Sequence, residues 1–522
     1  MDRIPKLTRR TLVQSGIALG AATSITGVLP GKAQAQNAVP RVRVATDIQH
    51  LDPFDQIGGP EETIKSGVLV TLVRRAQEDD PAWELYAAEA IDIVDDVTIA
   101  FTLRDDIAWT GGFGPVTAED VKFSFERMAA PDGGSPWQYA WDPLDHVEVV
   151  DARSGIIHLK TPFAPLFNAT LPWYAGHIVS KAAVEAAGGG FTTEFPAECG
   201  PYLMTEWAPN ASITLDRNPG WSADHPDFDG YELVIISDDK AAELAFDAGE
   251  IDFTLVAPDS VPRLRENLPD GTSLLELPSI NYSWIGMNVD HAPLDDIRVR
   301  QAIQYAIDVD QILLGAYAGA VEPSTGIQAP GTLGHRQARG IAAPDLDKAR
   351  ALLEESGHGD GLELTLSCLN DSVSAAVAQI VQAQLSEVGI TIDIRSYDPG
   401  VYWNLGLESE GDDWKNLDLT LMAYGGGIDP SENLVWFTPD QVGVWNWERW
   451  SNAEFGELYD KALIELDNEK RDQMYLRMQD LMEESAAYVF LTHGTVAALY
   501  RDWMVPFVNP DRTLALPKFK RA

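Results

Sequence analysis

The chain has 522 residues and a formal net charge of -42, with 80 acidic and 38 basic side chains. One hydrophobic core cannot serve a chain of this length, so two or three domains are expected. The charge argues against nucleic acids and anionic membrane surfaces as partners. An acidic excess spread along the whole chain indicates a solvated surface more than a preference for cationic ligands, although such a preference stays open.

The first 35 residues have the pattern of a twin-arginine export signal. Arg9 and Arg10 precede an uncharged stretch, 15–30, and the small-x-small sequence Ala-Gln-Ala at 33–35 marks a cleavage site. The apolar run is too short and too rich in Gly, Ala, Ser and Thr for a stable membrane span, and no later stretch qualifies. The sequence therefore predicts a soluble protein that is exported to the periplasm.

The two cysteines bear on both anchoring and redox state. Neither Cys199 nor Cys368 lies near the cleavage site, which excludes a lipid anchor on a processed N-terminal cysteine. They are far apart in sequence, and Cys368 lies on the apolar face of a predicted strand. We therefore expect two buried thiols rather than a disulfide.

The stretch 98–128 has the pattern strand, loop, helix. Apolar residues alternate over 98–103, and a loop with Trp109 follows. Thr117 and Asp120 then form a capping box ahead of an apolar helical face that ends at Met128.

Further along, helix and strand patterns alternate between residues 345 and 422. The stretches 362–368, 390–394 and 417–422 have the two-residue period of strands. A helix joins the first two, and the right-handed crossover makes them parallel. If the third also runs parallel, three ligand-type loops meet at the carboxyl edge of one sheet, where α/β proteins bind ligands: CLNDS, YDPGVYW and AYGGGIDPSENLVWF.

Several stretches, in this order and spacing, resemble family 5 of the extracytoplasmic solute-binding proteins, the peptide, nickel and opine receptors of ABC importers. The resemblance covers nearly the whole mature chain. Its specificity comes from the combination of the following segments: DDVTIAFTLRDDIAWTGG with PVTAEDVKFSFERM, CGPYLMTEW with LDRNPGW, AAELAFDAGEIDFTLV, WIGMNVDHAPLDDIRVRQAIQYAIDVDQIL, and APDLDKARALLEESG.

The resemblance implies an α/β fold with the two lobes of a type II periplasmic binding protein, in the large form with an extra subdomain. Lobe I is then discontinuous, lobe II is continuous, and the subdomain is inserted in lobe I, with these boundaries: lobe I, 36–61, 195–277 and 490–522; subdomain, 62–194; lobe II, 278–489. Function follows by domain closure on a small solute. We expect a monomer that delivers the solute to permease subunits and needs no cofactor.

Two departures from the family pattern concern loops. Gly111, Gly112 and Phe113 replace the usual Asp-Gly-x-Pro ahead of Pro115. Glycines fill 425–427, where peptide receptors of the family have an aspartate that holds the ligand's α-ammonium. A peptide stays the family default, a nickel chelate is less favoured, and an opine, betaine-like or other amine-bearing solute is the alternative.

The catalytic motifs of hydrolases are missing from the sequence. It contains no G-x-S-x-G, no H-E-x-x-H and no P-loop, and its nine histidines are scattered singly. An exported hydrolase is therefore disfavoured, and no catalytic or metal-binding residue is assigned. A structural or protein-recruiting module would show an exposed apolar stripe or repeats, and neither is visible.

The candidate ligand-binding residues lie on the three loops. Six aromatics near one loop edge are too many for the core, although about half should go there, and the remainder suit a cationic or zwitterionic solute through cation–π contacts of ~0.5–2 kcal/mol each. They are Tyr402, Trp403, Tyr424, Trp436, Trp445 and Trp447. Gly425, Asn370 and Asp371 complete the set together with Asp429.

Asp429 follows the glycines, and Pro430 restricts its backbone. One hypothesis has Asp429 meeting the ligand's positive charge, so that Asp429→Asn weakens binding by about 2–5 kcal/mol. The other has it capping or turning the backbone, so that stability falls and affinity barely moves. If affinity does not change, the ion pair moves to Asp371.

Overall fold

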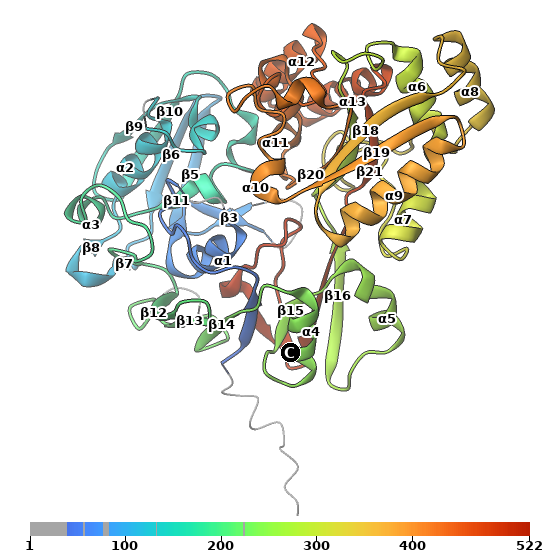
Figure 1. Cartoon of the computed structure of the whole chain (residues 1–522). Helices are drawn as coiled ribbons and strands as arrows, with labels where there is room; N and C mark the ends of the chain where they lie inside the picture. The colour runs from blue at the N-terminus through green and yellow to red at the C-terminus, as the bar shows by residue number, and fades with distance from the viewer. Residues whose placement is uncertain (1–38, 56–57, 77–82, 132, 223–224) are drawn as a thin grey trace, which may run out of the picture. The chain divides into compact units, whose positions relative to one another are not determined.

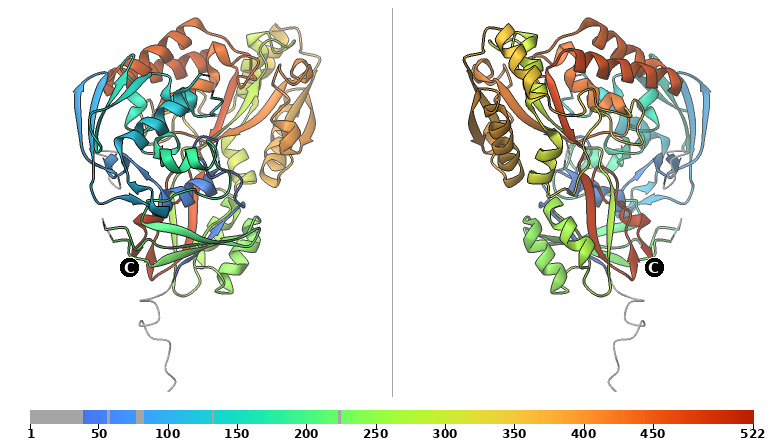
Figure 2. Two further views of the ribbon diagram at one scale, coloured as in Figure 1. Left: turned by 90° about the vertical axis from the view of Figure 1, so that its left-hand side faces the viewer. Right: turned by 90° about the vertical axis from the view of Figure 1, so that its right-hand side faces the viewer.

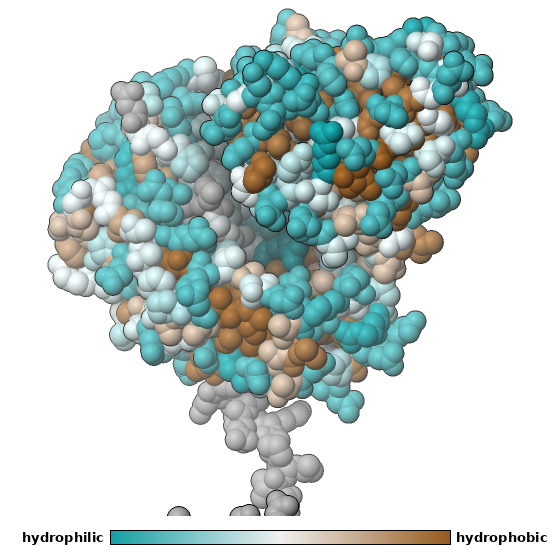
Figure 3. Space-filling view, viewed as in Figure 1, coloured by the Kyte–Doolittle hydropathy of each residue, from teal (hydrophilic) through white to brown (hydrophobic). Residues whose placement is uncertain are grey.

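The computed structural model describes residues 39–55, 58–76, 83–131, 133–222 and 225–522. The predicted export signal, 1–35, lies outside these ranges. No helix within them is long and apolar enough to cross a membrane. The visible face in Figure 3 is mainly hydrophilic, with apolar residues in small groups.

A seven-stranded sheet collects strands from three distant parts of the chain (Figure 1). β1 pairs in parallel with β14 and β15, whereas β22, from the C-terminal part of the chain, runs antiparallel between β15 and β16. In sheet order the strands are β12 (Tyr202–Ala208), β13 (Ser212–Arg217), β14 (Gly230–Ile235), β1 (Arg41–Val44), β15 (Phe253–Leu255), β22 (Thr495–Arg501) and β16 (Thr272–Pro278). Helix α4 (Asp239–Asp247) packs on β15, and α5 (Val261–Glu266) precedes β16.

A four-stranded antiparallel sheet confirms the first predicted strand and helix. Its order is β5 (Ala88–Asp95), β6 (Thr98–Leu103), β10 (Ser154–Leu159) and β9 (Leu144–Val149), and α2 (Ala118–Ala129) packs on β9. The predicted capping box is present: Asp120 Oδ2 accepts from the Thr117 backbone N–H at 2.9 Å. The same oxygen accepts from Trp109 Nε1 at 3.2 Å, which ties the loop to the helix start.

The five-stranded sheet contains the three strands predicted between residues 362 and 422. Its order is β19 (Ile390–Tyr397), β18 (Leu362–Leu369), β20 (Leu419–Tyr424), β17 (Tyr282–Met287) and β21 (Tyr488–Thr492). β18 is parallel to β19, which confirms the predicted crossover, and it is also parallel to β20, whose direction the sequence had left open. β17 runs antiparallel to β20, which makes the sheet mixed.

Helices bury both faces of this sheet. Ile285 and Met287 of β17 pack in one core with four helices, whereas Tyr282 and Trp284 of the same strand lie in another core with the C-terminal helices, as the alternation of a strand requires. The first four are α6 (Ile297–Ala306), α7 (Val309–Ala316), α8 (Leu346–Glu355) and α9 (Ser372–Ser386). The C-terminal helices α12 (Ala453–Ile464) and α13 (Asn468–Glu484) pack against each other (Figures 1 and 2).

Both cysteines are free and buried, as predicted from the sequence. Cys368 points into the core between β18 and its helices. Cys199 lies in the large core that includes the seven-stranded and four-stranded sheets. Burial raises the pKa of both thiols, so neither is poised to react.

Two short segments connect the seven-stranded and five-stranded sheets, and we call 279–281 and 493–494 the crossing segments. The first joins β16 to β17 and the second joins β21 to β22. They touch each other, since His493 Nδ1 lies 3.2 Å from the Asn281 carbonyl oxygen. The Gly426 N–H donates to Asn281 Oδ1 at 3.1 Å, so the loop after β20 also contacts a crossing segment.

The crossing segment 279–281 lies so close to the loop after β20 that Gly426 has no room for a side chain. A Cβ there would lie 1.7 Å from the Ile280 carbonyl oxygen, whereas one at Gly425 would meet none of the described atoms within 4 Å. We expect Gly426→Ala to lower the free energy of unfolding by about 1–3 kcal/mol, because backbone must move against backbone. Gly425→Ala is the matched control and should change it little. Urea denaturation of the two variants checks this, and equal effects would contradict the close approach.

Candidate ligand-binding site

The structure brings the six predicted aromatics together beyond the end of β20. The Tyr424 ring centroid lies 6.1 Å from that of Trp403 and 6.3 Å from those of Trp436 and Trp445. These four rings are partly exposed. Tyr402 and Trp447 are buried, and the Tyr402 hydroxyl donates to the Leu421 carbonyl at 2.6 Å. The cluster therefore divides between surface and core.

Asn370 and Asp371, the ligand-binding residues predicted on the loop after β18, are exposed and form hydrogen bonds with backbone groups of the protein. Asp371 is the N-cap of α9 and accepts from the N–H groups of Val373 and Ser374 at 3.0 and 2.9 Å. The Asn370 N–H donates to the Tyr397 carbonyl at 2.8 Å. Their role toward a ligand stays a prediction.

Asp429 already has a cationic partner inside the protein. Its carboxylate accepts from Arg471 Nη2 at 2.9 and 2.8 Å, and both side chains are 1% exposed. Asp429 also caps α11 (Pro430–Leu434), accepting from the backbone N–H and hydroxyl of Ser431 at 3.1 and 2.7 Å. The geometry therefore supports the capping hypothesis, with a buried ion pair added to it. The sequence carries no signal for this pair, because Arg471 lies 42 residues away on α13.

The cavity that best fits a small solute lies beside α11, and no predicted site residue lines it. It has a volume of about 230 Å³ and aromatic, mainly apolar walls, as small-molecule sites do. One wall comes from α11, the next residue and α12: Ser431, Glu432, Val435, Tyr459 and Leu463. The other comes from 137–175 and includes Trp137, Tyr139, Phe163, Trp173 and Tyr174. These aromatics lie in or directly before three short 3₁₀ helices, Gln138–Trp141, Ala164–Leu166 and Tyr174–Gly176, which are too short to show a period. No sequence pattern therefore distinguishes them from core residues.

Glu432 gives this cavity an unneutralised carboxylate. Its Oε2 is buried and has no hydrogen-bond partner among the described residues. The side chain folds over Gly427, where a Cβ would lie 2.1 Å from Oε2, so this glycine makes room for the carboxylate. Burial, with the nearby Asp429 charge, raises the pKa of Glu432 to about 8, although Arg75 acts in the opposite direction.

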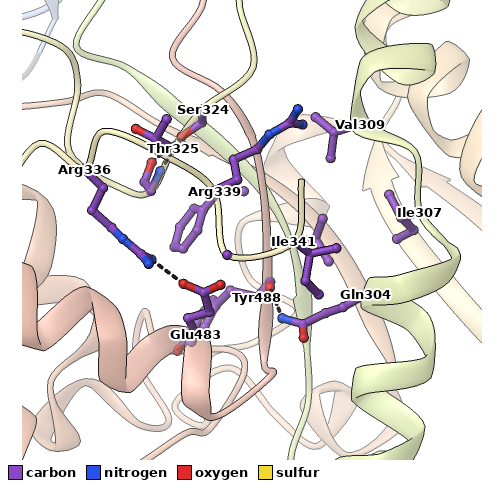
Figure 4. Close-up of a pocket in the computed structure, with 14 residues that line it drawn as sticks. Gln304, Ile307, Val309, Ser324, Thr325, Arg336, Arg339, Ile341, Glu483 and Tyr488 are labelled. Carbon is purple, nitrogen blue, oxygen red and sulfur yellow. Dashed lines mark hydrogen bonds and ion pairs between the residues drawn. The ribbon is translucent and has the colours of Figure 1, made fainter. Parts of the chain in front are cut away.

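A second cavity, of about 80 Å³, lies beside β21 and is drawn in Figure 4. Its charged groups already pair: Arg336 Nη1 contacts the Glu483 carboxylate, and Gln304 Nε2 donates to the Tyr488 carbonyl at 2.9 Å. Its volume and internal pairing make it a poorer site than the cavity beside α11. Across the described ranges, no group of three or more His, Cys, Asp or Glu side chains is placed to hold a metal ion.

Comparison with known proteins gives consistent matches over almost the full chain. The family model described as bacterial extracellular solute-binding proteins, family 5 Middle, matches residues 84–443. The glutathione-binding protein GsiB of Salmonella typhi is 28% identical over 510 residues, covering 95% of this chain and 96% of GsiB. GsiB of Escherichia coli K12 is 27% identical over 518 residues, covering 96% and 98%.

Two solved structures share the fold. The ABC transporter substrate-binding protein CtaP from Listeria monocytogenes superposes with a TM-score of 0.81 at 23% identity, covering 93% of this chain and 99% of CtaP. The periplasmic binding protein DppA from Helicobacter pylori, in complex with the peptide STSA, gives 0.76 at 21% identity, covering 94% and 99%. The two-lobed periplasmic binding protein architecture expected from the sequence is therefore confirmed. The lobe boundaries given above stay predictions.

The buried pair predicts a stability effect at Asp429. Asp429→Asn keeps a good N-cap but leaves the Arg471 guanidinium buried without its counter-charge. We expect the free energy of unfolding to fall by about 3–5 kcal/mol in urea denaturation. Asp371→Asn is the matched control, because the same change is made at an exposed N-cap without a buried arginine, and it should be nearly neutral. Similar losses in both variants would contradict a structural role for the pair.

The raised pKa of Glu432 predicts a pH dependence. The folded carboxyl, with a pKa of about 8, holds its proton where the unfolded one, near 4.5, has lost it. Its contribution to stability is therefore complete below pH 4.5 and is lost as pH rises through 8. Glu432→Gln stays neutral, so its stability relative to wild type should rise by up to about 1.4 kcal/mol per pH unit in this window. Urea denaturation at pH 5 and pH 8 checks this, and a constant difference would contradict the burial of an unneutralised acid.

Proposed function

This chain belongs to family 5 of the bacterial extracellular solute-binding proteins, and we propose that it is the substrate-binding receptor of an ABC importer for a peptide or peptide-like solute. It captures the solute by domain closure and delivers it to the permease subunits in the membrane. It acts as a receptor that returns its ligand unchanged rather than as an enzyme. The proposal includes export through the twin-arginine signal and a monomer free in the periplasm.

The observation that carries the receptor role is the cavity beside α11. Its two walls come from segments on opposite sides of the crossing segment 279–281: 137–175 precedes it, and α11 and α12 follow it. A solute that contacts both walls binds the closed arrangement better than an open one, and so shifts the population toward closure. The short crossing segments suit a hinge, because few backbone angles have to change there.

Two kinds of observation support the proposed class of solute: the ligands for which similar proteins are named, and the residues that follow β20. The GsiB relatives are named for binding glutathione, itself a small peptide, which supports a peptide-like ligand. The second candidate is a non-peptide amine-bearing solute such as an opine or a betaine. It is supported by the glycines at 425–427, which remove the aspartate used for a peptide's ammonium, and by the partly exposed Tyr424, Trp436 and Trp445.

Ligand-induced closure is the central expectation. A thermal-shift screen of glutathione, di- and tri-L-alanine, an opine and glycine betaine should find at least one solute that raises Tm. Small-angle scattering with that solute at saturation should then show a smaller radius of gyration, because the lobes close. An unchanged radius would count against the proposed function.

A variant that fills the cavity locates the site. Val435→Trp should abolish the thermal shift, because the larger ring occupies the space beside Glu432. Val401→Trp is the matched control, since Val401 is 53% exposed in the short helix α10 (Pro399–Tyr402) after β19 and does not line this cavity. If Val401→Trp abolishes binding and Val435→Trp does not, the ligand lies at the loop edge predicted from the sequence.

A further inference from the structure

A partly paired arginine stacks on Trp173, one of the residues that line the cavity beside α11. Arg75, in β3 (Val73–Arg75), lies with its guanidinium carbon 4.0 Å from the centre of the Trp173 ring. Its Nη1 is 3.5 Å from Asp511 Oδ2, a long ion pair. Its Nε and Nη2 are buried and have no hydrogen-bond partner among the described residues. The arginine therefore keeps two adjacent donors unused.

Trp173 links this arginine to the carboxylate of Glu432. Arg75 and Trp173 line a small cavity of about 70 Å³, and Trp173 also lines the 230 Å³ cavity that contains Glu432. Arg75 is close enough to be one of the charges that act on the pKa of Glu432, yet Glu432 Oε2 makes no hydrogen bond to any described residue. Glu432 and Arg75 thus border cavities that share Trp173, and no hydrogen bond joins the two groups.

We propose, building on the receptor function above, that Glu432 and Arg75 recognise the two ends of a zwitterionic solute. The ligand's ammonium group meets Glu432, its carboxylate meets Arg75, and the segment between them lies along Trp173. Neither end is recognised by Asp429, whose charge Arg471 neutralises.

The chemistry of each group suits its end of the ligand. Adjacent guanidinium donors such as Nε and Nη2 form a planar fork that binds a carboxylate through two parallel hydrogen bonds. A buried carboxylate without a counter-charge is costly, and an ammonium group removes that cost on binding. A neutral solute, or one with charge of only one sign, leaves Glu432 or Arg75 without a partner. The site therefore selects against such solutes, because a buried polar group without a partner costs free energy.

Proton release gives a readout that a purely structural role would not produce. An acid with a pKa of about 8 is mostly protonated at pH 7, whereas pairing with an ammonium group requires the ionised form. Binding should therefore release a proton, and affinity should rise up to tenfold per pH unit toward pH 8. The titratable and charged groups that act with Glu432 in this step are Asp429 of its own helix, Arg75, Asp511, Tyr139 and Tyr459.

The test uses calorimetry of the full mature chain with L-alanyl-L-alanine, tri-L-alanine and glutathione. Glucose, which is neutral, cadaverine, which carries only positive charge, and succinate, which carries only negative charge, serve as comparisons. The best zwitterionic binder is compared with its N-acetylated form and its carboxyl-amidated form. Each block should weaken binding to wild type about thirtyfold or more. The acetylation penalty should disappear in Glu432→Gln and the amidation penalty in Arg75→Gln, because the group that senses the block is gone.

Matched controls and alternative outcomes separate this inference from the receptor function. Asp440→Asn and Arg350→Gln make the same charge changes at exposed positions outside both cavities and should keep both penalties. If a zwitterion binds but its penalties persist in Glu432→Gln and Arg75→Gln, or if glucose, cadaverine or succinate closes the protein as well as a zwitterion does, this inference is wrong and the receptor function stands. If no solute in this panel or the earlier screen raises Tm, both are overturned.

Discussion

The ion pair between Asp429 and Arg471 determines where the wall of the candidate site lies. Both side chains are 1% exposed, so removing either one leaves an uncompensated charge in the core. Arg471 also donates to the Tyr475 hydroxyl and to the Ala462 carbonyl, at 2.8 and 3.0 Å, which ties α11 to both C-terminal helices. Because Asp429 caps α11, the same pair fixes the helix that places Glu432 at the cavity.

The glycines at 425–427 connect this site with the crossing segments. Gly426 comes so close to Ile280 that a side chain cannot fit, and Gly427 leaves the space that the Glu432 carboxylate occupies. One short loop therefore contacts a crossing segment at Gly426 and the buried Glu432 carboxylate at Gly427. A ligand that draws Glu432 toward it acts directly on backbone packed against the segment about which closure is proposed.

Glu432 and Arg75 both have buried polar atoms that one ligand could hydrogen-bond at the same time. Glu432 and Arg75 each keep buried polar atoms without a partner among the described residues, and both border cavities that Trp173 lines. Buried polar atoms are almost always hydrogen-bonded in folded proteins, so two such groups of opposite charge at one place point to a ligand that supplies both partners. The aromatic side chains that line these cavities offer apolar contact area to such a ligand.

The sequence alone determined the elements and their local chemistry. The alternation at 98–103 and 362–368, the capping box at Thr117 and the parallel pairing of β18 with β19 follow from residues near one another in the chain, where periodicity, capping and the handedness of a crossover act. The direction of the third strand stayed open, and the structure shows β20 parallel to β18. Only the tertiary structure decided the role of Asp429 and the identity of the cavity wall. Arg471 lies 42 residues from Asp429, and Trp173 lines the same cavity as a helix more than 250 residues further on, so these contacts depend on packing between segments that are far apart in the sequence. Local patterns carry no information about which distant charge will neutralise a carboxylate. In the folded protein Arg471 pairs with Asp429, whereas Glu432 Oε2 has no partner among the described residues.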